Sequence, residues 1–534
     1  MNISADERYR DPEQRALAAR RAGALGMPAE VVASVRRLSG GLTGSRLRAE
    51  HLDRIGREGC VVLTTGQQLG LFGGPLLTFY KALTVVRAAR ALAAETGRPV
   101  VPLFWLQAED HDLAEINSCV IPPPPTSGLS AGAVEAPLTF EIFSGTARAS
   151  RSSVAVVVLG PEIDPVREDL IRRLGGLPYS DETAHGLRRH YRPEATFVEA
   201  FAGWLGEVFA EEGLLFLNPR DPALAPVFRP FFQRALADHR EMTARLLQRG
   251  EELRGAEGRE REQVFVRDDS PLFFYHPDGA EGPRFRLKWN GRSWSFVGRE
   301  GEIAPEALAA FLETEPGRFS SSALLRPLIQ DSILPSAGYV GGEAELRYLR
   351  QIEPLYPLFG RDRPLAIPRA RFVLREPRAR RLLDQLGLET ADVLNDESAA
   401  LEALFARRVD GDASPEALEA RLKGPIAALF QALGPDLARV NPGLVPAARR
   451  GEEKIARVLS GLKERYAAAL LEKHKVTRSQ FDRARQLLYP GGIPQERVYA
   501  TVAFLARHGP GLKAAVSERI DPFAPAPSLQ VLDL

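Results

Sequence analysis

The stretch that decides the fold runs from Cys60 to Leu106 and reads CVVLTTGQQLGLFGGPLLTFYKALTVVRAARALAAETGRPVVPLFWL. It opens on a short apolar run rich in β-branched residues, passes through the glycine-rich loop Gly66–Pro75, and continues as the Ala-, Leu- and Arg-rich segment Leu76–Thr96. A second apolar run, Val100–Leu106, follows. Strand, helix and strand in this order predict a βαβ unit. Ligand-binding residues of such a unit are expected at the carboxyl ends of its two parallel strands.

The α/β alternation is interrupted twice further along the chain. The proline tract Pro122–Pro125 breaks regular structure and opens a strand-prone segment that reaches about Gly160. A helix over Glu194–Glu212 and a buried strand over Leu214–Asn218 then continue the core pattern. Aromatic and polar residues alternate between turns over Phe265–Gly301, which predicts a small antiparallel sheet. We interpret the two interruptions as insertions into the core.

From about Leu382 onward the strand pattern disappears and apolar residues recur at helical spacing. Two such stripes flank the proline-bounded turn Asn441–Pro446, and an antiparallel pair of long helices is the predicted arrangement. Ordinary amphipathic helices packed against the core are the alternative. The stripes consist of Leu418, Leu422, Ile426, Leu429 and Leu433, and of Ile455, Val458, Leu462, Tyr466 and Ala469.

Composition narrows the class of protein. The chain has 534 residues, and its 70 basic residues nearly balance 69 acidic ones, so nothing favours a nucleic acid or an anionic membrane as partner. It has only two cysteines, Cys60 and Cys119, which argues for a reducing compartment and a cytoplasmic location. No signal-like start and no run of 18 apolar residues occurs, so neither secretion nor membrane spanning is expected.

Backbone groups of the glycine-rich loop can approach an anion at the start of the following helix. The loop matches neither the dinucleotide fingerprint nor the phosphate loop of nucleotide-hydrolysing enzymes. A tight turn held by hydrogen bonds from Gln67 and Gln68 explains it equally well. Lys81, one turn into the helix, either reaches back to the anion or is solvated.

The four consecutive residues Glu109, Asp110, His111 and Asp112 follow the second strand. Carboxylates there can hold an ammonium group, accept a proton or bind Mg²⁺, and the imidazole can move a proton. Adjacent side chains point in different directions, so at most two should face one ligand. The alternative is that one acid caps the next helix and that His111 is buried and hydrogen-bonded.

The segment Phe319–Glu345 carries a second polar group. Arg326, Gln330 and Asp331 share one side of a predicted helix, and Gly341 with Gly342 lets backbone approach a ligand. Glu345, Tyr348 and Gln351, on the next helix, are typical of an exposed face.

Five motifs follow one another along the chain: Thr64–Gln68 with Gly70–Phe72 and Gly74–Pro75; Phe104–Trp105 with Glu109–Asp112 and Glu115–Asn117; Arg326–Pro327 with Gln330–Asp331 and Leu334–Pro335; Tyr339–Gly342; and Gly492 with Gln495–Arg497. In this order they resemble the motifs of the BshC family, the cysteine ligases of the last step of bacillithiol biosynthesis. The resemblance implies a Rossmann-like α/β core as in class I aminoacyl-tRNA synthetases, two connecting insertions, and a helical coiled-coil domain that forms a homodimer. The expected divisions are a core at 1–121, 191–262 and 313–385, insertions at 122–190 and 263–312, a coiled coil at 386–490, and a C-terminal segment at 491–534.

The resemblance also implies that L-cysteine is joined through its carboxyl group to the amine of glucosaminyl malate, and that ATP or ADP binds near the C-terminal module. Our hypothesis is that ATP, with Mg²⁺ as a candidate companion ion, activates the cysteine carboxylate. No site for a resident metal is predicted. A nucleotide-binding dimeric scaffold without turnover, or a sugar nucleotide transferase, is the rival. The expected catalytic residues are Asp110, His111, Asp112 and Lys81; the substrate-binding residues are Thr65, Gly66, Gln67, Gln68, Gly74, Trp105, Glu109, Asn117, Arg326, Gln330, Asp331, Tyr339, Gly341 and Gly342; the nucleotide-binding residues are Tyr489, Gly491, Gly492, Gln495 and Arg497.

Overall fold

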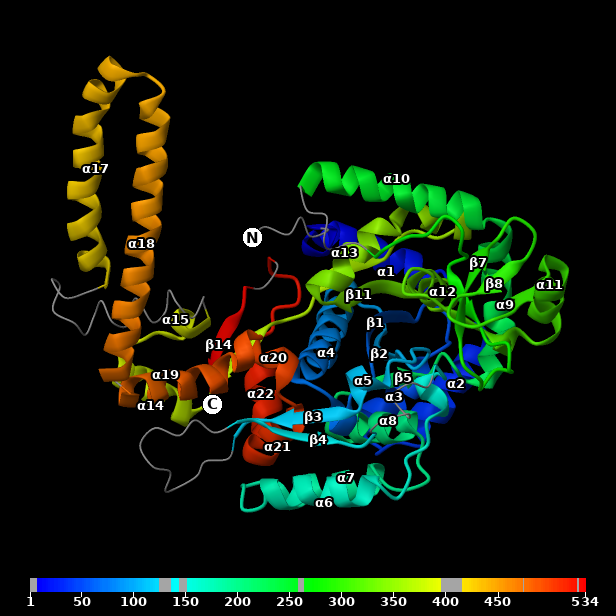
Figure 1. Cartoon of the computed structure of the whole chain (residues 1–534). Helices are drawn as coiled ribbons and strands as arrows, with labels where there is room; N and C mark the ends of the chain where they lie inside the picture. Colours follow the sequence, from blue (N-terminus) through cyan, green and yellow to red (C-terminus); the bar gives the residue numbers. More distant parts are fainter. Residues whose placement is uncertain are drawn as a thin grey trace. The chain divides into compact units, whose positions relative to one another are not determined.

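A computed structural model describes residues 7–123, 136–143, 151–257, 264–394, 415–473, 475–525 and 528–534. The chain divides into two compact units (Figure 1). The first, the core unit, comprises residues 1–121, 138–372 and 496–532, and the second, the helical unit, comprises 122–137, 373–495 and 533–534. Much of the first predicted insertion, residues 124–135 and 144–150, lies outside the described residues.

The core unit is built on a five-stranded parallel sheet in the order β12-β11-β1-β2-β5. Strand order reverses between β1 and β11, as in doubly wound folds, where ligands bind outside the carboxyl ends of the strands at this switch point. The predicted βαβ unit and the Rossmann-like class are therefore confirmed. The strands are β1 (Val61–Gln67), β2 (Val100–Leu106), β5 (Leu215–Leu217), β11 (Ser336–Gly341) and β12 (Leu365–Pro368).

Helices cover both faces of this sheet because alternate residues of its strands face opposite ways. Val101, Leu103 and Trp105 belong to a buried apolar cluster with residues of α2, α9 and α12, and Trp105 stacks on Phe228 with ring centroids 6.4 Å apart. Phe104 faces the other way and contacts α8. Figure 1 shows α4 lying against β1 and β2. The helices named here are α2 (Ala29–Gly40), α4 (Leu76–Thr96), α8 (Phe197–Val208), α9 (Ala225–Ala237) and α12 (Arg326–Ile333).

The helix boundaries follow capping chemistry. The helix predicted over Glu194–Glu212 begins only at Phe197, because Thr196 and Glu199 form a capping box. Helix α4 ends at Thr96, where Gly97 takes the left-handed conformation with φ of 69°. The remaining helices of the core unit are α1 (Pro12–Gly23), α3 (Arg46–Arg54), α5 (Leu113–Ile116), α6 (Ile163–Leu174), α7 (Ser180–His190), α10 (His239–Glu257), α11 (Pro305–Thr314), α13 (Glu343–Gln351), α21 (Thr501–His508) and α22 (Pro510–Arg519).

The predicted antiparallel sheet over Phe265–Gly301 is present. Its order is β10-β6-β7-β8-β9, and β10 comes from the segment that follows it in sequence. A separate antiparallel pair joins β3 and β4, which places one described strand in the first insertion. These strands are β3 (Ser118–Ile121), β4 (Leu138–Glu141), β6 (Phe273–Tyr275), β7 (Phe285–Trp289), β8 (Trp294–Phe296), β9 (Glu302–Ile303) and β10 (Phe319–Ser321).

The helical unit contains the predicted pair of long helices. Helices α17 and α18 run antiparallel on either side of the turn that follows Val440, as Figure 1 shows. The prediction that strands disappear after Leu382 is wrong, because β14 (Gln530–Asp533) forms near the C-terminus. The unit's helices are α14 (Pro377–Leu386), α15 (Thr390–Leu394), α17 (Pro415–Val440), α18 (Leu444–Lys473) and α19 (Lys475–Leu488).

Candidate active site

A pocket of about 460 Å³ opens at the switch point of the core sheet. Residues just beyond the carboxyl ends of β1, β2, β11 and β12 line it, together with residues from the antiparallel sheet and from α12. Both signs of charge meet there, which suits a ligand that is itself charged at several points. The charged lining residues are Lys81, Arg284, Arg326, Arg369 and Arg497, with Glu109, Asp110, Glu115 and Glu345.

Backbone N–H groups of the glycine-rich loop have hydrogen-bond partners within the protein. The N–H of Gly73 donates to the hydroxyl of Tyr191 over 2.9 Å and to the carbonyl of Gly70 over 3.1 Å, and the N–H of Gly74 donates to Leu71. Gly70 and Gly74 approach so closely that a Cβ on Gly70 would stand 2.6 Å from the Gly74 Cα. The tight-turn alternative therefore describes this loop, and glycine is required for close packing. Within the loop, only Gln67 and Gln68 line the pocket, and both stand near the beginning of the loop.

Lys81 is buried and neither solvated nor free to hold an anion. Its Nζ donates to the carbonyl of Gly66 over 2.8 Å and to Oε1 of Gln67 over 2.7 Å, and it forms an ion pair with Glu345. Burial acts to raise the pKa of Glu345, but the adjacent ammonium outweighs burial and holds that pKa below its usual value. All three ammonium hydrogens have partners. Lys81 thus joins β1 to α13.

Arg326 lines the pocket from the first turn of α12, and hydrogen bonds to Gln330 and Tyr348 hold its guanidinium in place. Its Nη1 donates to Oε1 of Gln330 over 2.9 Å, and its Nη2 donates to the Tyr348 hydroxyl over 2.7 Å. The hydroxyl of Tyr339 donates to Glu345 over 2.8 Å. The expectation that Glu345 and Tyr348 form an exposed face is wrong, because both line the pocket and both belong to this network. Gln351 is buried as well.

Glu109 is a buried acid at the wall of the pocket. Its carboxylate accepts two hydrogen bonds from Ser321, one from the backbone N–H over 2.8 Å and one from the hydroxyl. Burial raises the pKa of Glu109 above its usual value, although the two bonds from Ser321 oppose the shift. A carboxyl group with a raised pKa is suited to accept a proton near neutral pH.

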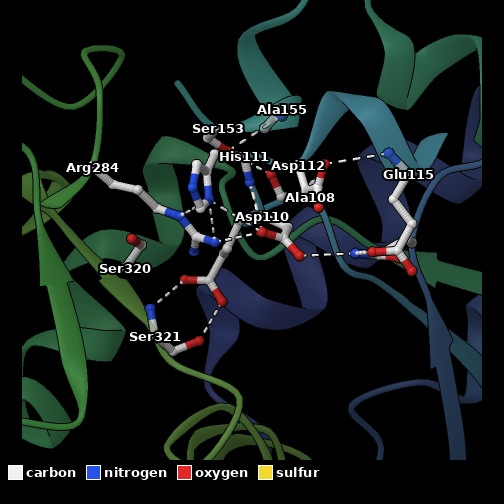
Figure 2. Close-up of polar contacts among 12 residues, drawn as sticks. Ala108, Asp110, His111, Asp112, Glu115, Ser153, Ala155, Arg284, Ser320 and Ser321 are labelled. Carbon is white, nitrogen blue, oxygen red and sulfur yellow. Dashed lines mark hydrogen bonds and ion pairs between the residues drawn. The ribbon is translucent and has the colours of Figure 1, made fainter. Parts of the chain in front are cut away.

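Asp110 is clamped between two elements (Figure 2). Its Oδ1 accepts from Nη2 of Arg284 over 2.5 Å, and its Oδ2 accepts from the amide of Gln68 over 2.9 Å. Burial acts to raise the pKa of Asp110, but the contacts with His111, Arg284 and Gln68 outweigh it and hold the pKa well below the usual range. Asp110 is therefore an anion at any physiological pH.

His111 has its Nδ1 turned to the same guanidinium. Nε and Nη2 of Arg284 lie 3.1 Å and 2.9 Å from it, and Figure 2 shows Arg284 pointing between His111 and Asp110. A guanidinium has only donors, so Nδ1 must accept and the ring carries its proton on Nε2. In this arrangement Nε2 is the ring nitrogen that does not face Arg284, and proton transfer through His111 stays a prediction.

Three other predicted site residues, Asp112, Trp105 and Asn117, do not line the pocket. Asp112 caps α5 by accepting from the N–H groups of Ala114 and Glu115 over 3.1 Å and 3.3 Å, as the capping alternative had it. Trp105 lies in the core beneath the sheet. The amide of Asn117 donates to Phe143 O over 2.9 Å and helps to hold the first insertion.

Three further predicted residues support the sheet edge. The hydroxyl of Thr65 donates to the carbonyl of Val340 over 2.8 Å and ties β1 to β11. Gly341 is buried against Tyr339, and a Cβ there would stand 2.9 Å from its ring. Gly342 lines the pocket, and its N–H donates to Glu345 over 2.9 Å. Of these three, Gly342 alone reaches the pocket.

The C-terminal segment supplies a cation to the pocket. Glu496 is fully buried and accepts two parallel hydrogen bonds, over 2.7 Å and 2.8 Å, from Arg369, which follows β12. The neighbouring Arg497 lines the pocket, is exposed, and has no side-chain partner among the residues that the structure describes. Arg497 therefore lies at the core pocket, and its role in nucleotide binding stays a prediction.

The other predicted nucleotide-binding residues belong to the helical unit. Both polar atoms of the Gln495 amide are used, by Leu374 N and O and by Leu487 O, over 2.8 to 3.0 Å. Tyr489 lies under the guanidinium of Arg485, 5.2 Å from ring centroid to Cζ. Gly491 and Gly492 are exposed and take positive φ angles of 59° and 78°. Gln495 is therefore a structural residue, and the two glycines form the turn before it.

Sequence reasoning missed Arg284, Ser321 and the pair Arg369–Glu496. Arg284 directly precedes β7 and Ser321 ends β10, and nothing in their local sequence indicates that they meet residues after β2. Glu496 lies within the recognised motif Gln495–Arg497, so its neighbourhood was found, but not its role.

The charged side chains of the pocket bear on which kinds of ligand it can hold. In the described ranges no three His, Cys, Asp or Glu side chains are arranged to hold a metal ion. Arg497 offers an uncompensated guanidinium, the group suited to phosphate oxygens.

In the described part of the chain, none of the helices has the length and apolar character that crossing a membrane requires.

Fold and pocket together define a Rossmann-like α/β protein with a charged pocket at the switch point of its sheet. Residues 6–370 match the family model described as "Bacillithiol biosynthesis BshC, N-terminal Rossmann-like domain", and residues 372–530 match that of the "C-terminal coiled-coil domain" of the same family. The chain therefore belongs to the BshC family of bacillithiol biosynthesis proteins.

Individual relatives agree with this assignment. A protein of Koribacter versatilis named "Putative cysteine ligase BshC" is 34% identical over 463 residues, which cover 86% of this chain and 81% of that protein. A protein of the same name from Symbiobacterium thermophilum is 30% identical over 535 residues, covering 94% and 89%. A solved structure described as a putative arginyl-tRNA synthetase from Campylobacter jejuni covers 91% of this chain and 99% of its own, but with 9% identity and a TM-score of 0.22 it adds nothing to the argument.

Proposed function

We propose that this protein joins the carboxyl group of L-cysteine to the amine of glucosaminyl malate, with consumption of ATP, to form bacillithiol. Family membership and the names of the relatives support the reaction class. The single observation that carries the proposal is the pocket at the switch point, where buried acids and arginines meet within about 460 Å³. A substrate with an amine and two malate carboxylates needs both kinds of partner.

The arginines are the proposed partners of anionic groups. Arg326 is presented to the pocket by two fixed hydrogen bonds, and Arg497 has no competing partner among the described residues. Fixed donors cost little reorganisation when charge develops in the reaction. We assign malate carboxylates to Arg326, and to Arg497 the phosphates of the nucleotide, with Mg²⁺ bound to those phosphates rather than by a protein site.

Glu109 is the proposed base. Amide formation releases a proton from the attacking ammonium, and the raised pKa of Glu109 brings its affinity for that proton closer to neutral pH. Asp110, an anion held by Arg284 and Gln68, is placed to orient the amine. The nucleotide supplies the activation of the cysteine carboxylate, which makes the uphill amide bond accessible.

The helical unit supports assembly as a homodimer. Along α17 and α18 the apolar side chains Leu429, Val458 and Leu462 are 58%, 66% and 47% exposed. A repeated apolar stripe on a helical pair is the pattern that coiled-coil association buries. We propose that a second copy of this chain covers it.

The test is mass spectrometry of the purified protein incubated with ATP, Mg²⁺, L-cysteine and glucosaminyl malate. Bacillithiol together with AMP or ADP is expected, and the nucleotide product names the activation route. In R497A the apparent KM for ATP should rise at least about tenfold, a loss of ~1.4 kcal/mol, whereas R519A, which removes an exposed arginine from the end of α22, should match the wild type. Absence of product with all substrates present, or transfer from a nucleotide sugar without cysteine, would overturn the proposal.

A further inference from the structure

We propose that Asp331 is a positioning residue that acts through Gln330 to hold Arg326 in the substrate pocket. The inference rests on the proposed function for the identity of the ligand, and it deepens that function by separating the residues that touch substrate from those that orient them. It replaces the expectation that all three residues of the Arg326–Asp331 segment contact the ligand.

The three side chains leave α12 in different directions. Arg326 lines the substrate pocket, while Gln330 is fully buried and lines no described cavity. Asp331 lines a separate cavity of about 120 Å³, whose wall includes Ser336 and Leu365. These two residues begin β11 and β12, so this cavity lies at the amino ends of the strands, the edge of the sheet opposite to the substrate pocket. Asp331 therefore cannot touch a ligand in that pocket.

The polarity of the hydrogen bonds fixes the Gln330 amide in one orientation. Nε2 of Gln330 donates to Oδ1 of Asp331 over 3.1 Å and to the Thr64 hydroxyl oxygen over 3.0 Å. Its Oε1 accepts from Arg326 over 2.9 Å. A carboxylate only accepts and a guanidinium only donates, so turning the amide over would set like groups against each other at both ends. As an acceptor, Asp331 thus keeps Nε2 of Gln330 turned towards itself and leaves Oε1 facing Arg326.

Arg326 has little other freedom. Its second terminal nitrogen donates to Tyr348, and its Cζ lies 5.5 Å from the ring centroid of Tyr339. The Gln330 bond is therefore one of two fixed points that set the plane of the guanidinium. Displacement of a substrate-binding group by about 1 Å can cost about 100-fold in rate, so the orientation matters for function.

The surroundings of Asp331 allow its carboxyl group to change its charge near pH 6. The Tyr356 hydroxyl donates to its Oδ2 over 2.7 Å, and burial raises its pKa to about 6. Arg326 faces it from its own helix, and the cavity on its other side carries charged groups from the N-terminal helices and from the loop before β12. These groups are Arg8, Arg21, Arg361, Asp362 and Arg363. Protonation below about pH 6 removes the charge that orients Gln330.

The experiment measures binding of glucosaminyl malate by calorimetry between pH 5 and 8. The wild type should bind about tenfold more weakly below pH 6 than above it. D331N, which is neutral at every pH, should bind with the weak affinity throughout. Y356F loses a hydrogen bond that lowers the pKa of Asp331, so its transition should move to higher pH, while Y275F, a change in the antiparallel sheet, should leave the transition in place. A D331N profile that keeps the wild-type transition would overturn the inference.

A second readout needs no ligand and separates this inference from the proposed function. The Nη protons of Arg326, assigned by comparison with R326K, should give resolved NMR signals at pH 7.5 in the wild type because the guanidinium is held at two points. They should broaden in D331N at the same pH. If glucosaminyl malate does not bind at any pH, the proposed function fails; if Arg326 signals are identical in wild type and D331N, the positioning role fails.

Discussion

Lys81 on α4 and Glu345 on α13 form a largely buried ion pair in the wall of the pocket at the switch point. The pair joins the first βα connection of the core to the first helix after the strand reversal. It also fixes Gln67 and Tyr339, since Lys81 donates to the former and Glu345 accepts from the latter.

Removing one member of this pair should destabilise the protein strongly. K81M leaves Glu345 as a buried charge without its cation, and breaking a buried pair in this way costs about 3–5 kcal/mol of unfolding free energy. Chemical denaturation at pH 7 measures the change. The matched control is E50Q, which removes the exposed pair of Arg46 and Glu50 and should cost no more than about 0.5 kcal/mol. Equal effects of the two substitutions would contradict the structural role of Lys81.

Arg284 should prove essential for activity although it belongs to the insertion. R284K keeps the charge but cannot donate to Asp110 and His111 at once, so kcat should fall by about 100-fold. Steady-state kinetics measure the effect. R299K, which alters an exposed arginine paired with Asp278 in the same sheet, should retain wild-type kcat. Should R284K be as active as R299K, the clamp on Asp110 has no catalytic consequence.

Glu109 should lower the stability of the folded protein at high pH, and it should be required for turnover. Its raised pKa means that the folded state holds the proton more tightly than the unfolded state does, so this contribution to stability is present at low pH and is lost as pH rises through the folded pKa. E109Q should therefore be more stable than the wild type at pH 8, with a smaller difference at pH 4. The same variant should lose turnover. Denaturation at the two pH values and a rate assay check both statements, and a destabilised E109Q at pH 8 would argue against a buried, costly carboxylate.

The apolar stripe of the helical unit should determine the oligomeric state. L429E or V458E introduces a charge where a second copy is proposed to pack, and light scattering after size-exclusion chromatography should then report a monomer. Q431E adds the same charge at an exposed polar position of α17 and should leave the dimer intact. A wild-type monomer at micromolar concentration would remove the basis of this prediction.

Local patterns in the sequence were sufficient for the elements around the pocket. The runs Leu76–Thr96 and Val100–Leu106 coincide with α4 and β2, because a glycine that ends the helix and a fully apolar strand leave few alternatives. The position of Glu109 and Asp110 at the end of β2 followed from the same reasoning.

Side-chain partners could not be predicted in the same way, because they lie far apart in the chain. From the sequence, Lys81 was expected either to reach back to an anion or to be solvated, whereas its actual partner, Glu345, lies in a distant helix. Arg284 meets His111 across 173 residues of sequence, in a segment interpreted only as an insertion. Conversely, Asp112 carried no ambiguity once α5 was known, since its role as a cap is local.

The bidentate pair of Arg369 and Glu496 has a consequence for the order in which the chain acquires its structure. The ribosome delivers Arg369 well before Glu496, with 127 positions between them in the numbering. During that interval the parallel sheet can assemble, yet it would enclose a guanidinium that has no counter-charge, at a cost of several kcal/mol. Formation of the pocket is thus coupled to completion of the chain. A nascent or truncated polypeptide that stops short of Glu496 lacks the partner of Arg369 and also lacks Arg497. Such a polypeptide cannot complete the pocket until synthesis has passed Arg497.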